Sequence, residues 1–129
     1  GGGDMFVFFN PNPGAKRVGD CAVRAIAKAM GTDWEKTYLA LCVEGLRAHD
    51  MPSGNSVWGS YLKANGFRQR ILPDACPECY TVAAFADEHP HGVYVLALSG
   101  HVVAVVNGDY YDTWDSGEEV PVYYFERED

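Results

Sequence analysis

Cys21, His101 and Asp112 are the residues whose types and spacing could together support nucleophilic catalysis. A cysteine thiol is a strong nucleophile only as the thiolate, and the free amides at a helix N-terminus lower the pKa of a nearby thiol. Cys21 follows Asp20, a favoured helix-capping residue, and opens a run of strong helix formers that ends before Gly31. We therefore expect Cys21 to be a nucleophile in the first turn of a helix, with a small buried core residue as the alternative.

His101 is placed to act as the base that a cysteine nucleophile needs. It directly follows Ser99-Gly100, and an apolar run over residues 102–106 comes after it. This pattern predicts a histidine at the mouth of a buried strand, where it could accept the proton of the thiol. A histidine that only supports the structure is the alternative, because single strand histidines often do so.

The register of a predicted hairpin selects the residue that orients His101. If the Asn-Gly pair after residue 106 forms a two-residue type I′ turn, residue 103 faces residue 112 across the hairpin. Asp112 is then the diagonal neighbour of His101 on one side of the sheet, and Trp114 covers the pair. A three-residue loop would bring Asp115 to His101 instead, so Asp115 is the alternative acid.

The elements that must position these residues follow from the periodicity of the chain. Helical spacing predicts helices over residues 21–30, about 33–48, 56–64 and 81–88, and Thr32 with Glu35 matches a capping box for the second of them. Alternation predicts strands over residues 5–9, 67–72, 92–98, 101–106, 109–114 and 120–125, the last four as an antiparallel meander. We expect a flexible leader over residues 1–3 and a single α+β domain over residues 4–129, with N-terminal helices packed on a C-terminal antiparallel β-sheet.

The composition disfavours several classes of partner. Ten Lys and Arg against 18 Asp and Glu give a net charge of −8, whereas nucleic acids and anionic membranes are bound by basic surfaces. No run of 18 apolar residues could span a bilayer, and the short apolar run over residues 5–9 lacks the length and the basic flank of a signal peptide. We therefore expect a cytoplasmic protein, or one released on lysis, whose four cysteines are thiols.

Three segments resemble the motifs of papain-like cysteine peptidases. They are Gly-Asp-Cys-Ala-Val-Arg-Ala-Ile at residues 19–26, Gly-His-Val-Val-Ala-Val-Val at 100–106 and Tyr-Asp-Thr-Trp at 111–114. Their order and spacing are most similar to the compact branch typified by the bacteriocin-leader-processing peptidases. The Asp-Thr-Trp is similar to the Asn-Ser-Trp of papain, whose first residue orients the histidine. Asn-Pro-Asn-Pro at residues 10–13 also resembles the start of uncharacterised small proteins of phages and gut bacteria, which indicates no function.

This resemblance implies a papain-like core and a cysteine hydrolase without a cofactor. Cys21, His101 and Asp112 would cleave a peptide or other amide bond of a peptide or protein substrate through a thioester acyl-enzyme. The family usually carries a glutamine six residues before the cysteine as a donor to the oxyanion, and here that residue is Ala15. Asn12, in the preceding loop, is the candidate replacement. Because loss of such a donor is costly, a catalytically silent papain-like binding module is the second hypothesis.

Two further cysteines and two histidines are weak candidates for a zinc site. Cys76 and Cys79 form a Cys-x-x-Cys pair, which is a common half of a zinc site, and His89 and His91 follow it. The His-x-His spacing, with a proline inside it, is tighter than usual. We therefore expect no bound metal and two free thiols, with zinc or a redox pair as the alternatives.

Overall fold

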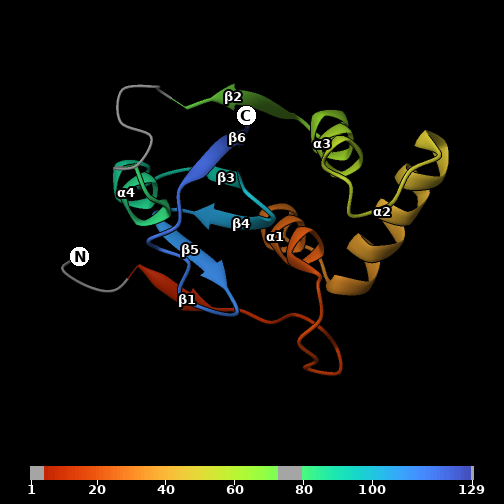
Figure 1. The fold of residues 1–129 in the computed structure, drawn as a ribbon, viewed down its shortest axis with the longest axis horizontal. Coiled ribbons are helices and arrows are strands. Elements are labelled where there is room, and N and C mark those ends of the chain that lie inside the picture. Colours follow the sequence, from red (N-terminus) through yellow and green to blue (C-terminus); the bar gives the residue numbers. More distant parts are fainter. Residues whose placement is uncertain (1–4, 73–79, 129) are drawn as a thin grey trace.

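The computed structural model describes residues 5–72 and 80–128, which form four helices and six strands (Figure 1). The helices are α1 Cys21–Met30, α2 Trp34–Ala48, α3 Asn55–Ala64 and α4 Val82–Glu88. The strands are β1 Phe6–Phe8, β2 Phe67–Ile71, β3 Val93–Leu98, β4 His101–Val106, β5 Asp109–Asp112 and β6 Pro121–Arg127. The predicted α+β class is confirmed. The predicted leader over residues 1–3 lies outside the described residues, as do Cys76 and Cys79.

The six strands form one mixed sheet in the order β1-β5-β4-β3-β6-β2. The predicted meander is correct for β3, β4 and β5, but β6 pairs with β3 rather than with β5, and β1 pairs with β5 in parallel. The chain after β5 leaves the sheet because its carbonyl groups accept hydrogen bonds from the first turn of α4: Gly117 from Ala83, and Glu119 from Val82. It then returns on the far side of β3, whose six residues are all buried.

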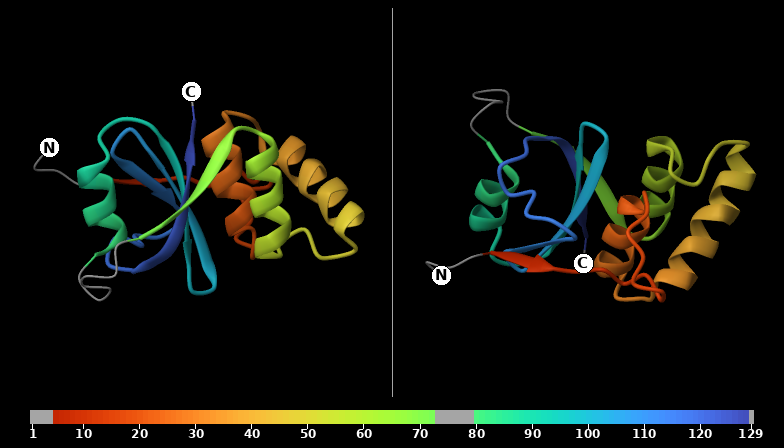
Figure 2. Two further views of the ribbon diagram at one scale, coloured as in Figure 1. Left: turned by 90° about the horizontal axis from the view of Figure 1, so that it is seen from above. Right: turned by 60° about the horizontal axis from the view of Figure 1, so that its bottom comes forward.

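Helices cover both faces of this sheet (Figure 2). Helices α1, α2 and α3 lie on one side and α4 lies on the other (Figure 1). Alternation along β3 divides the core: Val93, Val95 and Ala97 pack with α1 and α3, while Tyr94, Leu96 and Leu98 pack with α4. The central strand is therefore apolar throughout, since neither of its sides reaches solvent.

The predicted hairpin register is confirmed. Asn107 and Gly108 have φ angles of 49° and 86°, as a type I′ turn requires, and Val106 pairs with Asp109. Strand β5 ends at Asp112, two residues earlier than predicted. The side chain of residue 112 therefore lies where the ladder stops, and this places its carboxylate next to the first residue of β4.

The starts of α1 and α2 differ from the expected capping. Helix α2 is capped by Asp33, whose carboxylate accepts the Lys36 amide at 2.7 Å, so the predicted Thr32 to Glu35 capping box is wrong and the cap lies one residue later. Asp20 occupies the capping position of α1, but its side chain makes no capping hydrogen bond. Its carboxylate is used elsewhere, as described below.

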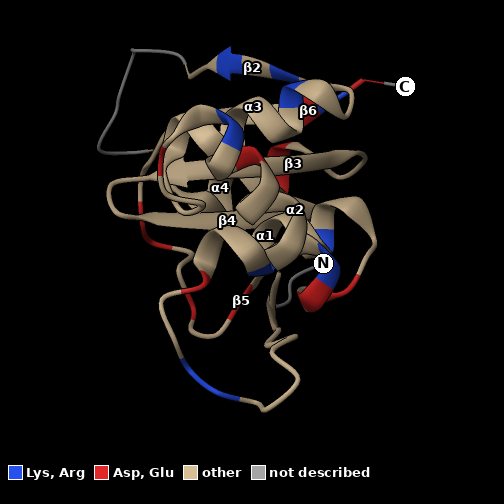
Figure 3. Ribbon diagram, turned by 90° about the vertical axis from the view of Figure 1, so that its right-hand side faces the viewer, with Lys and Arg blue, Asp and Glu red and all other residues tan. Residues whose placement is uncertain are grey.

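Among residues 5–72 and 80–128, no helix combines the length and the apolar character needed to cross a membrane. The ten Lys and Arg of the chain are spread over the loop before α1, the first three helices and strands β2 and β6 (Figure 3). Arg24 differs from the other nine because it alone is buried.

Candidate active site

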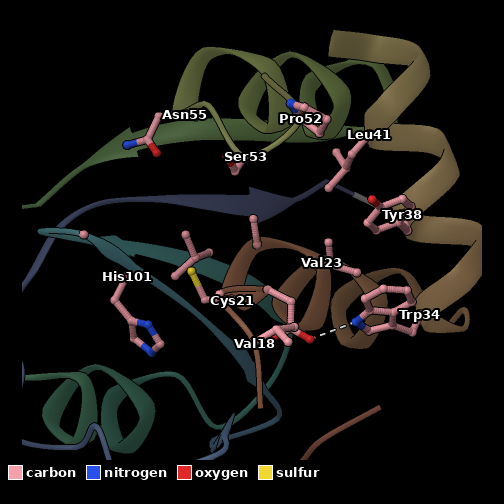
Figure 4. A pocket seen from close by; sticks show the side chains of 15 residues that line it. Val18, Cys21, Val23, Trp34, Tyr38, Leu41, Pro52, Ser53, Asn55 and His101 are labelled. Carbon is pink, nitrogen blue, oxygen red and sulfur yellow. Dashed lines mark hydrogen bonds between the residues drawn. The ribbon is translucent and has the colours of Figure 1, made fainter. Parts of the chain in front are cut away.

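Cys21 is the first residue of α1 and lines a pocket together with His101, the first residue of β4 (Figure 4). Asp20 and the helix formers after it set the start of α1 at the cysteine, and the tight turn at Ser99-Gly100 sets the start of β4 at the histidine. The structure therefore brings together two side chains that are 80 positions apart in sequence.

The Cys21 thiol lies in surroundings that favour the thiolate. Burial raises the pKa of Cys21, but hydrogen bonding and charge from the His101 imidazole, together with the backbone N–H of Val102, outweigh burial and lower it. Arg24 contributes a smaller lowering of the same pKa through its positive charge. The net effect is a pKa below the ordinary value of a thiol, as an activated nucleophile requires.

His101 is held in its protonated form. Burial lowers the pKa of His101, whereas hydrogen bonds and charge from Asp112 and Cys21 raise it, and the result is a pKa of about 9. The lowered pKa of Cys21 and the raised pKa of His101 both favour a thiolate–imidazolium pair over a neutral pair. Trp114 lies over the ring, with 5.1 Å between ring centroids, and so covers it on one side.

Asp112 is the carboxylate that orients His101. Its Oδ2 lies 2.6 Å from His101 Nε2 and also accepts the Ser116 hydroxyl at 2.8 Å. Its Oδ1 accepts the Thr113 amide at 2.8 Å and Arg24 Nη2 at 3.1 Å. Burial raises the pKa of Asp112, but the bonds from His101, Ser116 and Thr113 lower it, so the carboxylate is ionised. Because Nε2 is taken by Asp112, the ring nitrogen left for Cys21 is Nδ1.

Asp115, the alternative acid, lies away from His101. Its carboxylate accepts the Tyr110 hydroxyl at 2.5 Å and the Gly117 amide at 3.0 Å. The type I′ register explains this placement, since it puts residue 112 and not residue 115 on the histidine side.

Asn12, the candidate donor to the oxyanion, does not line the pocket that holds Cys21. Its side-chain oxygen accepts the amides of Gly14 and Lys16 at 2.8 and 3.3 Å, and so closes the loop before α1. The structure therefore does not place Asn12 in the pocket of the thiol, because the hydrogen bonds to its Oδ1 hold the side chain in its own loop.

The amides at the start of α1 remain as donors at this site. The Asp20 carboxylate, the usual cap, accepts instead from Arg24 and from Trp34 Nε1, the latter at 2.8 Å. Within the described part of the chain, no residue accepts a hydrogen bond from the backbone N–H of Cys21. That N–H can therefore donate to the oxyanion that forms when the sulfur attacks a carbonyl group.

The pocket itself has a volume of about 500 Å³ and extends from the thiol to α2 (Figure 4). Its far wall is formed by Trp34, Tyr38 and Leu41, and Pro52 and Ser53 of the loop before α3 close it together with Asn55, the first residue of α3. Trp34 and Tyr38 stack at 5.0 Å. Sequence reasoning did not identify this wall; the signal that could have found it is the Trp and Tyr side chains, which favour positions with one edge in water.

The zinc candidates within the described residues do not form a metal site. His89 Nδ1 lies 2.7 Å from the Phe85 carbonyl oxygen, and its ring stacks on the Phe85 ring at 3.8 Å. In residues 5–72 and 80–128, no three His, Cys, Asp or Glu side chains gather as metal ligands would, His91 included. Cys76 and Cys79 lie outside the described residues, so the half-site that they would supply stays a prediction.

Comparison with known proteins gives no relative for this chain: no family model matches it, and searches of curated proteins and of solved structures find no similar protein. The papain-like resemblance of the three motifs thus stays a prediction.

Proposed function

We propose that this chain is a cysteine hydrolase that cleaves a peptide or other amide bond. The observation that carries the proposal is that Cys21, at the start of α1 and beside the pocket, contacts His101, and that His101 in turn contacts Asp112. Each member has its pKa shifted in the direction that acyl transfer needs: lowered for the thiol, raised for the imidazole and lowered for the carboxyl.

The first half of the reaction forms a thioester. The Cys21 thiolate attacks the carbonyl carbon of the amide, the C–S bond forms, and the carbonyl electron pair moves onto oxygen. The N–H of Cys21 and the start of α1 stabilise this oxyanion. The His101 imidazolium then donates its proton to the amide nitrogen, the C–N bond breaks, and the amine leaves.

The second half releases the acyl group. His101, now neutral, accepts a proton from water as the water oxygen attacks the thioester carbon. The C–S bond breaks, the acid is released, and the thiolate and imidazolium are restored. Asp112 holds the ring in one tautomer through both halves. An amine that replaced water would give a transferase through the same thioester.

The chemistry of the chain also supports a choice of substrate class. A net charge of −8 and a pocket whose far wall is apolar favour a peptide or protein segment over a nucleic acid. The reaction requires no cofactor. A reduced thiol nucleophile fits a protein that works in the cytoplasm or is released on lysis.

The test is the pH dependence of thiol alkylation. Iodoacetamide should label Cys21 below pH 7 faster than Cys42, a half-buried thiol of α2 that serves as an internal control. His101→Ala should slow the labelling of Cys21 at pH 6 by about tenfold for each unit by which the thiol pKa rises. Peptide mapping by mass spectrometry reports each site. Equal labelling of Cys21 and Cys42 in the native protein would contradict an activated nucleophile.

The second candidate function is a binding module with the same pocket and no turnover. The position of Asn12 favours it, because a side-chain donor to the oxyanion is worth about 10² to 10³ in rate. An acyl probe separates the two functions. A covalent acyl adduct on Cys21 supports the hydrolase, whereas an activated thiol that takes iodoacetamide but no acyl group supports the module.

A further inference from the structure

The proposed triad touches a second pair of buried charges, Asp20 and Arg24, which the reaction itself does not use. Arg24 Nη1 donates to Asp20, and Arg24 Nη2 donates to Asp112 at 3.1 Å. Asp20 and Arg24 are each 6% exposed and Asp112 is 1% exposed. Because a buried ion pair is often no more stable than an apolar replacement, a row of three buried charges calls for a reason other than stability.

We propose that Asp20 and Arg24 are positioning residues of the active site, which fix the Asp112 carboxylate against His101 and set the pH range over which Cys21 reacts. This inference rests on the proposed function, since it acts through the same nucleophile and base. Neither residue touches the reacting atoms.

The geometry supports the positioning role. Asp20 and Arg24 are four positions apart, so they lie on one side of α1, and Cys21 is between them in the first turn. Arg24 reaches Asp112, 88 positions later, and thereby joins the helix of the nucleophile to the strand of the acid. A guanidinium is suited to this because its planar fork serves two carboxylates in fixed directions.

The charges around Cys21 support the second part of the proposal, that Asp20 and Arg24 set the pH range over which Cys21 reacts. Side-chain charges alternate through the contacts: negative Asp20, positive Arg24, negative Asp112 and positive His101, which in turn contacts the Cys21 thiol. Asp20, Cys21 and Arg24 come from α1, His101 from β4 and Asp112 from β5.

The nearest other charges are directed elsewhere. Lys28 lies over the Tyr111 ring at 4.2 Å, Asp115 binds Tyr110, and α2 contributes the neutral Trp34. Arg24 is the cation next to Asp112 that is not itself part of the proposed triad. The positive charge of Arg24 therefore shifts the pKa of Cys21 and the pKa of His101 in the same direction.

The experiment compares two variants whose effects must have opposite signs. Arg24→Gln removes a positive charge, so the midpoint of Cys21 alkylation and the NMR midpoint of His101 should both rise, by about 0.5 to 1 pH unit. Asp20→Asn removes a negative charge, so both midpoints should fall, by about 0.5 unit. A residue that only supports the fold would change the amount of folded protein and leave both midpoints in place.

Two further variants serve as controls. Arg24→Lys keeps the charge but loses the fork, so its midpoints should stay within about 0.3 unit of the native values while amide cleavage slows. Lys28→Gln removes the same charge one turn along α1 and, being partly exposed, should move the midpoints by less than about 0.2 unit. If Arg24→Gln does not fold, Asp20→Asn decides the result alone.

The outcomes separate this inference from the proposed function. Opposite shifts in Arg24→Gln and Asp20→Asn support it. Shifts of the same sign, or none, overturn it while a native Cys21 that reacts below pH 7 still supports the hydrolase. If native Cys21 titrates as an ordinary thiol, the proposed function and this inference both fail.

Discussion

Two clusters in this molecule each contain a histidine, and their surroundings are opposite in kind. The charged cluster, at the starts of α1 and β4, consists of Asp20, Cys21, Arg24, His101 and Asp112. The aromatic cluster, beneath α4, consists of Phe85, His89, Tyr94 and Tyr124.

The difference between the clusters lies in what each histidine contacts. His101 meets a carboxylate at 2.6 Å and a thiol, and its pKa rises to about 9. His89 meets a carbonyl oxygen and the face of a phenyl ring. Apolar packing lowers the free energy of the folded state but does not change how readily a side chain gives up or takes a proton. Buried charges do change this, at some cost in stability. We therefore expect variants of the charged cluster to change reactivity and variants of the aromatic cluster to change stability.

The largest expected effect comes from Asp112→Ala. The variant removes the group that accepts from His101 Nε2, so the ring is no longer oriented toward Cys21 and amide cleavage should fall by about 10² to 10⁴. Asp115→Ala is the matched control, because Asp115 binds Tyr110 and does not touch the histidine. Its rate should stay within about twofold of the native rate, since it lies outside the contacts of His101. Equal losses in the two variants would contradict the assignment of Asp112.

The same variant tests the protonation of His101. In the native protein the raised pKa keeps the imidazole protonated at pH 7, and it loses its proton only as the pH rises through about 9. Asp112→Ala removes the carboxylate that raises this pKa, so the NMR midpoint of His101 should move to lower pH. An unchanged midpoint would mean that the contact with Asp112 does not hold the proton.

Phe85→Ala should have the largest effect in the aromatic cluster. Phe85 is fully buried and contacts the rings of His89, Tyr94 and Tyr124, so its loss should lower the free energy of unfolding by about 3 to 5 kcal/mol. Phe8→Ala, at a ring that is 57% exposed, should change it by about 0.5 kcal/mol. Urea denaturation measures both. The folded Phe85→Ala protein should keep the native reactivity of Cys21, and a lost reactivity would show that the clusters are coupled.

The parts of the site that depend on local rules could be predicted from the sequence. The start of α1 follows from the run of helix formers that begins at Cys21, although Asp20 does not cap it, and the pairing of residue 106 with 109 follows from Asn-Gly. Those two local features place Cys21 on a helix end and Asp112 beside His101, because the side-chain period of a strand is two.

The parts that depend on distant contacts could not be predicted. The partner of Arg24 is 88 positions away, and nothing near Arg24 in sequence distinguishes it from a surface arginine. The place of β6 beside β3 depends on the hydrogen bonds of Gly117 and Glu119 to α4. Tertiary contacts decide both of these features. Asn12 is a different case: it is proposed for the site from its side-chain type, whereas hydrogen bonds to its Oδ1 from within its own loop hold it away from the pocket.

Ser116→Ala should have a smaller effect on the charged cluster. The hydroxyl is fully buried and is one of two donors to Asp112 Oδ2, so its loss leaves the carboxylate less well held. We expect amide cleavage to fall by about tenfold, which corresponds to one lost hydrogen bond to a charged group. The pKa of Asp112 should rise, since the Ser116 bond lowers it in the native protein. Ser60→Ala, on the exposed surface of α3, is the control and should change neither quantity.

His89→Gln should have the smallest effect and sharpens the contrast between the clusters. A glutamine amide can still donate to the Phe85 carbonyl, so the main loss is the stacking of two rings, worth about 1 kcal/mol. Urea denaturation should show that decrease, and alkylation of Cys21 should keep its native pH midpoint. His101→Gln makes the identical substitution in the charged cluster, where it should raise the midpoint, because the imidazolium that lowers the thiol pKa is gone. If both substitutions moved the pH midpoint of Cys21 alkylation equally, the contacts of each histidine would not explain why one is reactive and the other structural.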